Sequence, residues 1–234
     1  MRWSRLSPVF ALTLTCASLP LAAQAAEPNW LSVVGLYPQP ATVQAQSEVA
    51  ILLWLQVSRT AQDEARADSE RTPSLGCFLD VLQTPGYASA PGRGLDLSQF
   101  PRTAAVLDQA RQDLLPILAG LQNTFMRPRP DQAYPAVVPS LPQPGGYSYP
   151  STNAALGILF ARILAQWLPA DQAALATRGA LLGTDRVLGG VHYPSDVVAG
   201  QALGKAFATY WIDQPGHLQL IQTACSEWPN PTAL

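Results

Sequence analysis

The chain of 234 residues is long enough for one domain with its own hydrophobic core. Its formal charge is only −2 at pH 7. That charge is not the signature of a protein that binds nucleic acid or an anionic membrane through its overall field. Any binding of phosphate must therefore come from a local cluster of basic groups.

The N-terminal residues 1–25 predict a secretory signal peptide. Two arginines precede an apolar stretch over residues 9–21, and Ala-Gln-Ala at residues 23–25 has the small residues of a cleavage site. A membrane anchor is the alternative, but it needs a longer apolar run and a charged stop. No later segment is long and apolar enough to span a bilayer. Residues 26–234 are therefore expected to form a single domain in the periplasm or outside the cell.

Two cysteines remain once Cys16 has been removed with the signal peptide, namely Cys77 and Cys225. An even pair in an oxidising compartment predicts one disulfide between the N-terminal half and the C-terminal tail. Two free buried thiols are the alternative, because spacing along the chain says nothing about disulfide geometry.

In the first half of the chain two segments have the pattern of helices. The proline-rich residues 27–45 are expected to run over the surface. Residues 47–67, apolar first and charged later, predict a helix. Residues 71–100 carry Gly, Pro and Ser and are expected to be loop, with room for one short helix. Residues 103–125 repeat apolar side chains at helical spacing, and Pro116 is expected to kink or divide that helix.

In the second half residues 126–150 form a proline-rich loop. Three helices are predicted after it, over residues 151–168, 171–182 and 195–211. Gly183 is predicted as the C-cap of the second helix, and Ser195 as the N-cap of the third. Because no strand pairing is evident, the fold class is all-α.

The Ser-Thr-Asn sequence at residues 151–153 opens one of these helices. The first turn of a helix has unpaired backbone N–H groups and the positive end of the helix dipole. These donors can bind an oxyanion. Ordinary helix capping is the alternative interpretation.

A second cluster runs from Arg186 to Asp196 and includes His192. His192 and Asp196 are four residues apart, a spacing that brings two side chains together at a helix start. A carboxylate bonded to one ring nitrogen fixes the tautomer and leaves the other nitrogen free to attack. Arg186 adds a planar cation suited to phosphate oxygens. A structural His–Asp pair beside a surface arginine is the alternative.

A third cluster is Arg-Pro-Arg-Pro at residues 127–130. Taken together, the three clusters resemble the motifs of the bacterial class A non-specific acid phosphatases, which belong to the type-2 phosphatidic acid phosphatase superfamily. The signature of that family is Lys, six residues, Arg-Pro; then Pro-Ser-Gly-His; then Ser-Arg, five residues, His, three residues, Asp. The order and separations agree over roughly residues 47–212. The resemblance implies a helical bundle of the type-2 phosphatidic acid phosphatase and haloperoxidase kind, with no metal and no other cofactor.

The resemblance also implies roles for individual residues. His192, oriented by Asp196, would attack phosphorus and form a phosphohistidine. Phosphate binding would fall on Arg129, Ser151, Thr152 and Arg186. The substrates would be small phosphorylated molecules.

Two positions depart from the family signature. The family lysine is replaced by Gln122, and the histidine that acts as general acid is replaced by Asn153. General acid catalysis is typically worth ~10²–10⁴-fold in rate, and a lost charged donor costs a phosphate ligand on the order of 1.5–3 kcal/mol. Asp185 is a conceivable replacement acid, although its carboxylate would repel a phosphate dianion. Lys205 is an unlikely substitute for the lysine, and His217 is expected to be a surface residue.

Two functional hypotheses follow from these observations. The first is an exported phosphohydrolase with altered or reduced activity, and the second is a degenerate homologue that binds phosphate or a phosphorylated ligand without turnover. Vanadium haloperoxidases have the lysine and second histidine that are missing here, so that function is disfavoured. The physiological substrate, the pH optimum and homo-oligomer formation are left open.

Overall fold

The computed structural model describes residues 25–72, 75–80 and 97–228 of the chain. The predicted signal peptide lies outside these ranges, apart from its last residue, Ala25. In the described part every regular element is helical and no strand is present. The predicted all-α class is therefore confirmed. The α-helices are α1 (Trp30–Val34), α2 (Val43–Ser58), α3 (Ala61–Ser69), α4 (Leu75–Asp80), α5 (Pro101–Phe125), α6 (Pro130–Ala133), α7 (Thr152–Trp167), α8 (Gln172–Leu188), α9 (Pro194–Ile212) and α10 (Pro215–Ala224).

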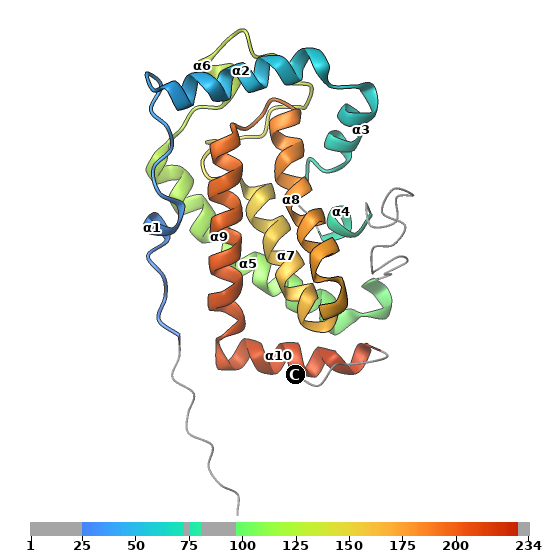
Figure 1. Ribbon diagram of the computed structural model, residues 1–234. Helices are drawn as coiled ribbons and strands as arrows, with labels where there is room; N and C mark the ends of the chain where they lie inside the picture. Colours follow the sequence, from blue (N-terminus) through green and yellow to red (C-terminus); the bar gives the residue numbers. More distant parts are fainter. Residues whose placement is uncertain (1–24, 73–74, 81–96, 229–234) are drawn as a thin grey trace, which may run out of the picture.

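The centre of the molecule is a three-helix unit in which α7 packs against both α8 and α9 (Figure 1). Helix α5 passes behind this unit and contacts α7. Helix α2 lies across the end where α9 begins, and α10 lies across the opposite end. None of the helices within the described ranges combines the length and hydropathy needed to cross a bilayer.

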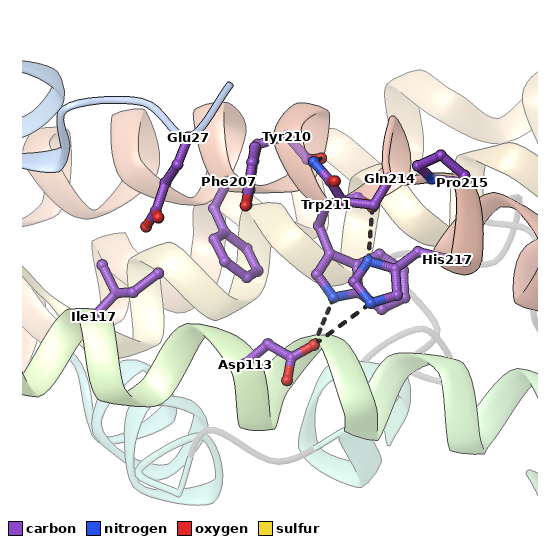
Figure 2. A pocket seen from close by; sticks show the side chains of 10 residues that line it. Glu27, Asp113, Ile117, Phe207, Tyr210, Trp211, Gln214, Pro215 and His217 are labelled. Atoms are coloured by element: carbon purple, nitrogen blue, oxygen red, sulfur yellow. Dashed lines mark hydrogen bonds and ion pairs between the residues drawn. The ribbon is translucent and has the colours of Figure 1, made fainter. Parts of the chain in front are cut away.

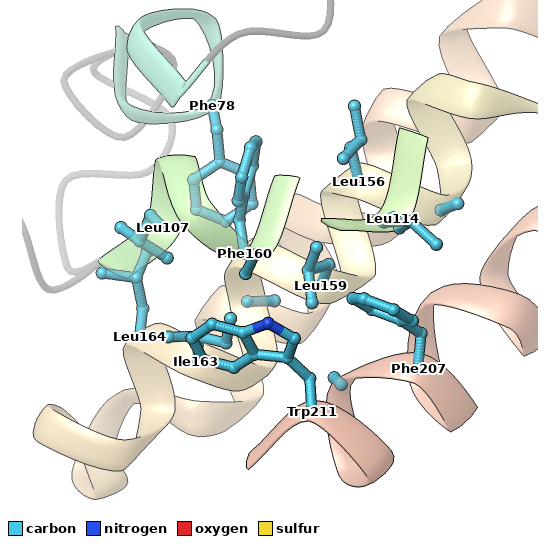
Figure 3. Close-up of a cluster of buried hydrophobic side chains, with 14 of the residues drawn as sticks. Phe78, Leu107, Leu114, Leu156, Leu159, Phe160, Ile163, Leu164, Phe207 and Trp211 are labelled. Carbon is cyan, nitrogen blue, oxygen red and sulfur yellow. The ribbon is translucent and has the colours of Figure 1, made fainter. Parts of the chain in front are cut away.

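The main hydrophobic core lies between α5, α7 and α9 (Figure 3). Leu114 of α5, Leu159 of α7 and Phe207 of α9 are at most 2% exposed. Burying a side chain of this size contributes about 1.5–3 kcal/mol. Phe160 meets Phe78 of α4 edge-to-face, with the ring centroids 5.9 Å apart. The apolar side chains of the predicted helix over residues 151–168 therefore face the core.

Small residues let the central helices approach each other closely. A Cβ atom added at Gly157 of α7 would lie 2.3 Å from the carbonyl oxygen of Gly179 on α8. One added at Gly204 of α9 would lie 2.2 Å from the carbonyl oxygen of Ala155 on α7. These contacts leave no room for a side chain, so glycine is required for the packing of α7 against both neighbours.

The helix predicted over residues 47–67 is in fact two helices, and the prediction is wrong at this point. α2 ends at Ser58, and α3 begins at Ala61. The hydroxyl of Thr60 accepts the N–H of Asp63, and the Asp63 carboxylate accepts the N–H of Thr60. This capping box starts a new helix, because it supplies partners for N–H groups that a helix start leaves unpaired.

Three further local predictions are corrected by the structure. Of the two effects predicted for Pro116, division of the helix is excluded, because α5 runs for 25 residues from Pro101 to Phe125. Gly183 does not end a helix, since α8 continues to Leu188. A Cβ atom at Gly183 would lie 2.7 Å from Val197 of α9, so this glycine serves packing. Ser195 is not an N-cap, because α9 begins one residue earlier.

The disulfide predicted between Cys77 and Cys225 is not formed. Cys225 carries a free thiol, whose sulfur donates to the carbonyl oxygen of Ile221 at 3.5 Å. The side chain of Cys77 is not among those described.

Candidate functional site

A cavity of about 340 Å³ lies where the starts of α7 and α9 meet the end of α8. Six of the predicted site residues line this cavity, namely Gln122, Arg129, Thr152, Asn153, Arg186 and His192. Arg71 and Thr72, which follow α3, line it as well. The lining formed by the described residues thus contains three arginines and no carboxylate.

The chain between α8 and α9 presents His192 to this cavity. Gly190 adopts a positive φ of 77°, which turns the chain sharply after α8. Pro194 then occupies the first position of α9, where its missing N–H costs nothing. The Asp196 carboxylate accepts the backbone N–H of Tyr193 at 2.8 Å and so closes the first turn.

The partners of His192 determine its tautomer. Its Nδ1 lies 3.2 Å from Oδ2 of Asp196, and its Nε2 lies 3.2 Å from Nη1 of Arg129. A carboxylate only accepts and a guanidinium only donates. Nδ1 therefore carries the proton, and Nε2 keeps a lone pair.

Burial lowers the pKa of His192, which is 3% exposed. Asp196 opposes this effect, while the charges of Arg129 and Arg186 add to it. The imidazole is accordingly neutral at rest. A neutral ring with a lone pair on Nε2 has the form required of a nucleophile.

Arg129 is held in place by backbone carbonyl groups. Its Nη1 donates to Val191 at 2.9 Å, and its Nη2 donates to Gly145 and Tyr147 at 3.1 and 3.3 Å. Its Nε is buried and has no hydrogen-bond partner among the described residues. Burial lowers the pKa of Arg129, and the Asp196 carboxylate raises it. The guanidinium is thus fixed beside Nε2 of His192.

Arg186, in the last turn of α8, is the second predicted guanidinium in the cavity wall. It is 2% exposed, and its Nη2 donates to the carbonyl oxygen of Ala67 in α3. Helix α3 therefore fixes the position of Arg186. The two arginines come from segments 57 positions apart along the chain but border the same space as His192.

The first turn of α7 only partly matches its predicted role. Thr152 and Asn153 line the cavity, whereas Ser151 has no exposed surface and stands outside the lining. The Ser151 hydroxyl accepts the N–H of Ala154, and its N–H donates to the carbonyl oxygen of Asp196 at 2.9 Å. Ser151 therefore caps α7 and joins it to the start of α9.

The two residues that depart from the family signature are both tied to protein groups. The amide nitrogen of Gln122 donates to the carbonyl oxygen of Pro150 at 2.9 Å and to the hydroxyl of Thr152 at 3.2 Å. The amide nitrogen of Asn153 donates to the carbonyl oxygen of Glu70 at 3.0 Å. Neither side chain brings a charge or a titratable proton to the cavity.

Asp185, considered as a replacement acid, does not serve the cavity. It is fully buried, and both of its carboxylate oxygens accept from Arg66 at 2.9 Å. This bidentate pair ties α8 to α3. Lys205 is exposed on α9 and is not part of the lining, as expected.

His217, predicted to be a surface residue, keeps 26% of its side chain exposed and lines a second cavity of about 540 Å³ (Figure 2). Its ring stacks on Trp211 with the centroids 4.0 Å apart. Its Nδ1 lies 2.9 Å from the carbonyl oxygen of Trp211, and its Nε2 lies 3.9 Å from Asp113 of α5. This histidine therefore belongs to the end of the molecule near α10, away from His192.

Sequence reasoning missed Arg71 and Thr72 at the cavity, as well as Glu48 and Arg127 behind it. Arg71 and Thr72 carry no motif that would have identified them. Arg127 stands in the Arg-Pro-Arg-Pro cluster, and Glu48 is a lone acid at the start of an apolar run. A lone acid in an apolar run predicts a buried carboxylate, and such a carboxylate needs a cation as its partner.

Comparison with known proteins identifies a related protein family. Residues 114–218 match the PAP2 superfamily, and they include the cavity residues from Gln122 to His192. The predicted resemblance to this superfamily is therefore confirmed over residues 114–218.

Two curated relatives are phosphatases by name. The acid phosphatase of Zymomonas mobilis is 34% identical over 123 residues, which cover 51% of this chain and 47% of that protein. The non-specific acid phosphatase of Salmonella typhimurium is 44% identical over 57 residues, or 24% of this chain and 23% of that protein. The chain thus matches less than half the length of each relative.

A transmembrane PAP2-type phosphatidylglycerolphosphate phosphatase from Bacillus subtilis is a structural neighbour. It has a TM-score of 0.48 and 22% sequence identity, with 77% of this chain and 89% of that chain covered.

Proposed function

We propose that this protein is an exported phosphohydrolase that cleaves phosphomonoesters through a phosphohistidine formed on His192. The observation that carries the proposal is a cavity lined by three arginines and a neutral imidazole, with no carboxylate among the described lining residues. Such a lining favours a phosphate dianion. The names of the two relatives, both acid phosphatases, support the same reaction.

In the proposed reaction the Nε2 lone pair of His192 attacks phosphorus, and the bond between phosphorus and the ester oxygen breaks. The Nδ1 proton stays on the ring, where the Asp196 carboxylate offsets the new positive charge. Arg129 and Arg186 neutralise the charge that spreads over the phosphoryl oxygens. Substrate must first replace the resting contact between Arg129 and Nε2. A water molecule then attacks phosphorus, which releases inorganic phosphate and restores the lone pair.

The leaving oxygen has no acidic side chain to protonate it at Asn153, because an amide has no titratable proton. Such an oxygen departs as an anion or takes its proton from water. Aryl phosphates, which have good leaving groups, are therefore the preferred substrates. Alkyl phosphates should be slower by a factor on the order of 10²–10⁴, the usual contribution of general acid catalysis.

The test is hydrolysis of p-nitrophenyl phosphate by the purified protein at acidic pH. His192→Ala should abolish the reaction, whereas His217→Ala, the matched loss of the only other histidine, should leave it intact. A rapid alkaline quench with labelled substrate should trap phosphate on the wild-type chain only. Equal rates in wild type and His192→Ala would refute the proposal. N-terminal sequencing of protein recovered outside the cytoplasm tests the proposed export, and it should begin near residue 26.

A second candidate is binding of phosphate without turnover. It is favoured by the side chains of Gln122 and Asn153, whose amide nitrogens are already bonded within the protein. Calorimetry with inorganic phosphate, together with the rate assay, separates the two functions. If phosphate binds and no substrate is hydrolysed, the double variant Gln122→Lys with Asn153→His should introduce activity.

A further inference from the structure

Behind the cavity, four charged or titratable side chains form a continuous buried chain. Arg127 donates from Nη2 to Oε2 of Glu48 at 2.9 Å and from Nη1 to Oδ1 of Asp196 at 2.6 Å. The other oxygen of Asp196 faces Nδ1 of His192. All four residues are at most 4% exposed. We call this series, Glu48–Arg127–Asp196–His192, the buried ion chain.

The guanidinium of Arg127 is fixed on its faces as well as on its edges. It lies 3.8 Å from the ring centroid of Tyr193 and 4.8 Å from that of Tyr37. Its Nη1 also donates to the hydroxyl of Ser195 at 2.7 Å. Aromatic contacts of this kind restrict a guanidinium to one plane. Arg127 can therefore hold the Asp196 carboxylate in a single orientation.

Glu48 connects the buried ion chain to α2. Its Oε2 accepts from Arg127, and its Oε1 accepts the backbone N–H of Ser195 at 2.7 Å. Ser195 lies in the first turn of α9, so Glu48 satisfies an N–H group that the helix start leaves unpaired. One carboxylate from α2 thus supports both the arginine and the helix that carries Asp196.

We infer that Glu48 and Arg127 are positioning residues that set the orientation and the proton affinity of the His192 imidazole. This inference rests on the proposed function in one respect, namely that the imidazole is the nucleophile. Neither residue lines the cavity, so both act through Asp196.

Glu48 and Arg127 should have opposite effects on the pKa of His192. The Asp196 carboxylate favours protonation of His192, and the charge of Arg127 weakens that attraction. Glu48 in turn offsets the charge of Arg127. Loss of Glu48 should therefore lower the pKa of His192, and loss of Arg127 should raise it. The other charged groups that face His192 are Arg129, from the segment before α6, and Arg186 of α8, and they are unchanged in both variants.

The test uses nuclear magnetic resonance of the histidine ring protons. The chain has only two histidines, so His217→Ala assigns the signals. Glu48→Gln keeps the size of the side chain and an oxygen for the N–H of Ser195, and it should lower the pKa of His192 by about 0.5 unit or more. Glu48→Asp, which keeps the charge, should shift it less. Arg127→Gln leaves two buried carboxylates without their cation and is expected to be much less stable. Glu48→Gln therefore carries the test.

Glu64→Gln is the matched control. Glu64 also pairs with an arginine, Arg59, at 2.8 Å, but its side chain is 43% exposed and it lies on α3. The control changes the net charge equally and should leave the pKa of His192 unchanged. In the rate assay, the acid limb of the kcat/KM profile for p-nitrophenyl phosphate should move to lower pH in Glu48→Gln alone, by the same amount as the pKa.

The outcomes distinguish the inference from the proposed function. A lowered pKa of His192 in Glu48→Gln supports the inference even if wild-type protein hydrolyses nothing, a result that would remove the proposed function alone. The inference would be overturned if Glu48→Gln folds, its His192 has the wild-type pKa, and its kcat/KM profile has the wild-type acid limb. The proposed phosphohydrolase function would stand in that case.

Discussion

The close contact between α7 and α9 predicts a coupled loss of stability and activity in Gly200→Ala. A Cβ atom at Gly200 would lie 2.4 Å from the carbonyl oxygen of Ser151 and 3.0 Å from Cβ of Ala154. Carbon and carbonyl oxygen atoms normally approach to about 3.3 Å at their closest. The start of α7 must therefore move away from α9 by about 1 Å.

The cost of this substitution can be estimated from two opposing effects. Overpacking of a close contact typically costs about 1–3 kcal/mol, and alanine gains up to about 1 kcal/mol over glycine within a helix. Because the clash involves a backbone atom of a packed helix, we expect a net loss of about 1–2 kcal/mol. For a chain of this size that loss lowers Tm by about 3–6 °C.

The same displacement should reduce catalysis more than it reduces stability. Thr152 and Asn153 at the start of α7 line the same cavity as His192, and the N–H of Ser151 donates to the carbonyl oxygen of Asp196. A misplacement of about 1 Å between reacting groups can cost ~10²-fold in rate. We therefore expect kcat/KM for p-nitrophenyl phosphate to fall by roughly that factor.

Thermal unfolding followed by circular dichroism, together with the rate assay, checks both expectations. The matched control is Gly120→Ala on α5, where an added Cβ atom meets no atom within 4 Å. Gly120→Ala should raise Tm slightly, because alanine favours the helix, and should not change the rate. If Gly200→Ala were as stable as Gly120→Ala, or kept the wild-type rate, the close approach of α7 and α9 would not be what aligns the two sides of the cavity.

Three further predictions follow from charges in and around the cavity. Asp196→Asn should lower kcat by at least ~10³-fold, because an amide does not hold the tautomer of the nucleophile. It should also lower the free energy of unfolding in urea by about 3 kcal/mol, because it breaks the buried pair with Arg127. A fully active variant would contradict the role of Asp196. Burial raises the pKa of Glu70 from 4.5 to about 7, so its contribution to stability is complete below pH 4.5 and is lost as the pH rises to about 7. The unfolding free energy of Glu70→Gln minus that of wild type should therefore increase between pH 4.5 and pH 7 by on the order of 2 kcal/mol. A constant difference over that range would refute the raised pKa of Glu70. Arg71→Gln, at an exposed position of the cavity lining, should raise KM by about 3–10-fold with little change in kcat, as expected for a residue that only binds phosphate; a loss confined to kcat would place Arg71 in the chemical step instead.

Some structural predictions from the sequence were reliable because they depend on neighbours along the chain. The apolar side chains of residues 103–125 and 151–168 recur at helical spacing, and both segments are helices. The four-residue spacing of His192 and Asp196 brought those two side chains together. In each case the relevant contacts lie within one or two turns of a helix.

Predictions about interruptions of helices were less reliable, for a physical reason. A glycine can end a helix or admit a neighbouring helix, and the sequence around Gly183 is compatible with both. The presence of Val197 and Ala154 beside it decides in favour of packing. The break before α3 was readable in principle, because Thr60 and Asp63 have the spacing of a capping box.

By itself the sequence determined that the chain is helical, that His192 has its own carboxylate, and that the positions of the family lysine and second histidine are uncharged. Only the tertiary structure decided which distant charges meet. Arg127 bonds Glu48 across 79 positions of the chain, and Arg66 bonds Asp185 across 119. A charge in a helix is compatible with many partners, and the pair forms only where packing removes water and brings the atoms within about 3 Å. The helix contacts that produce this arrangement depend on the shapes of whole surfaces, which short spacings do not reveal.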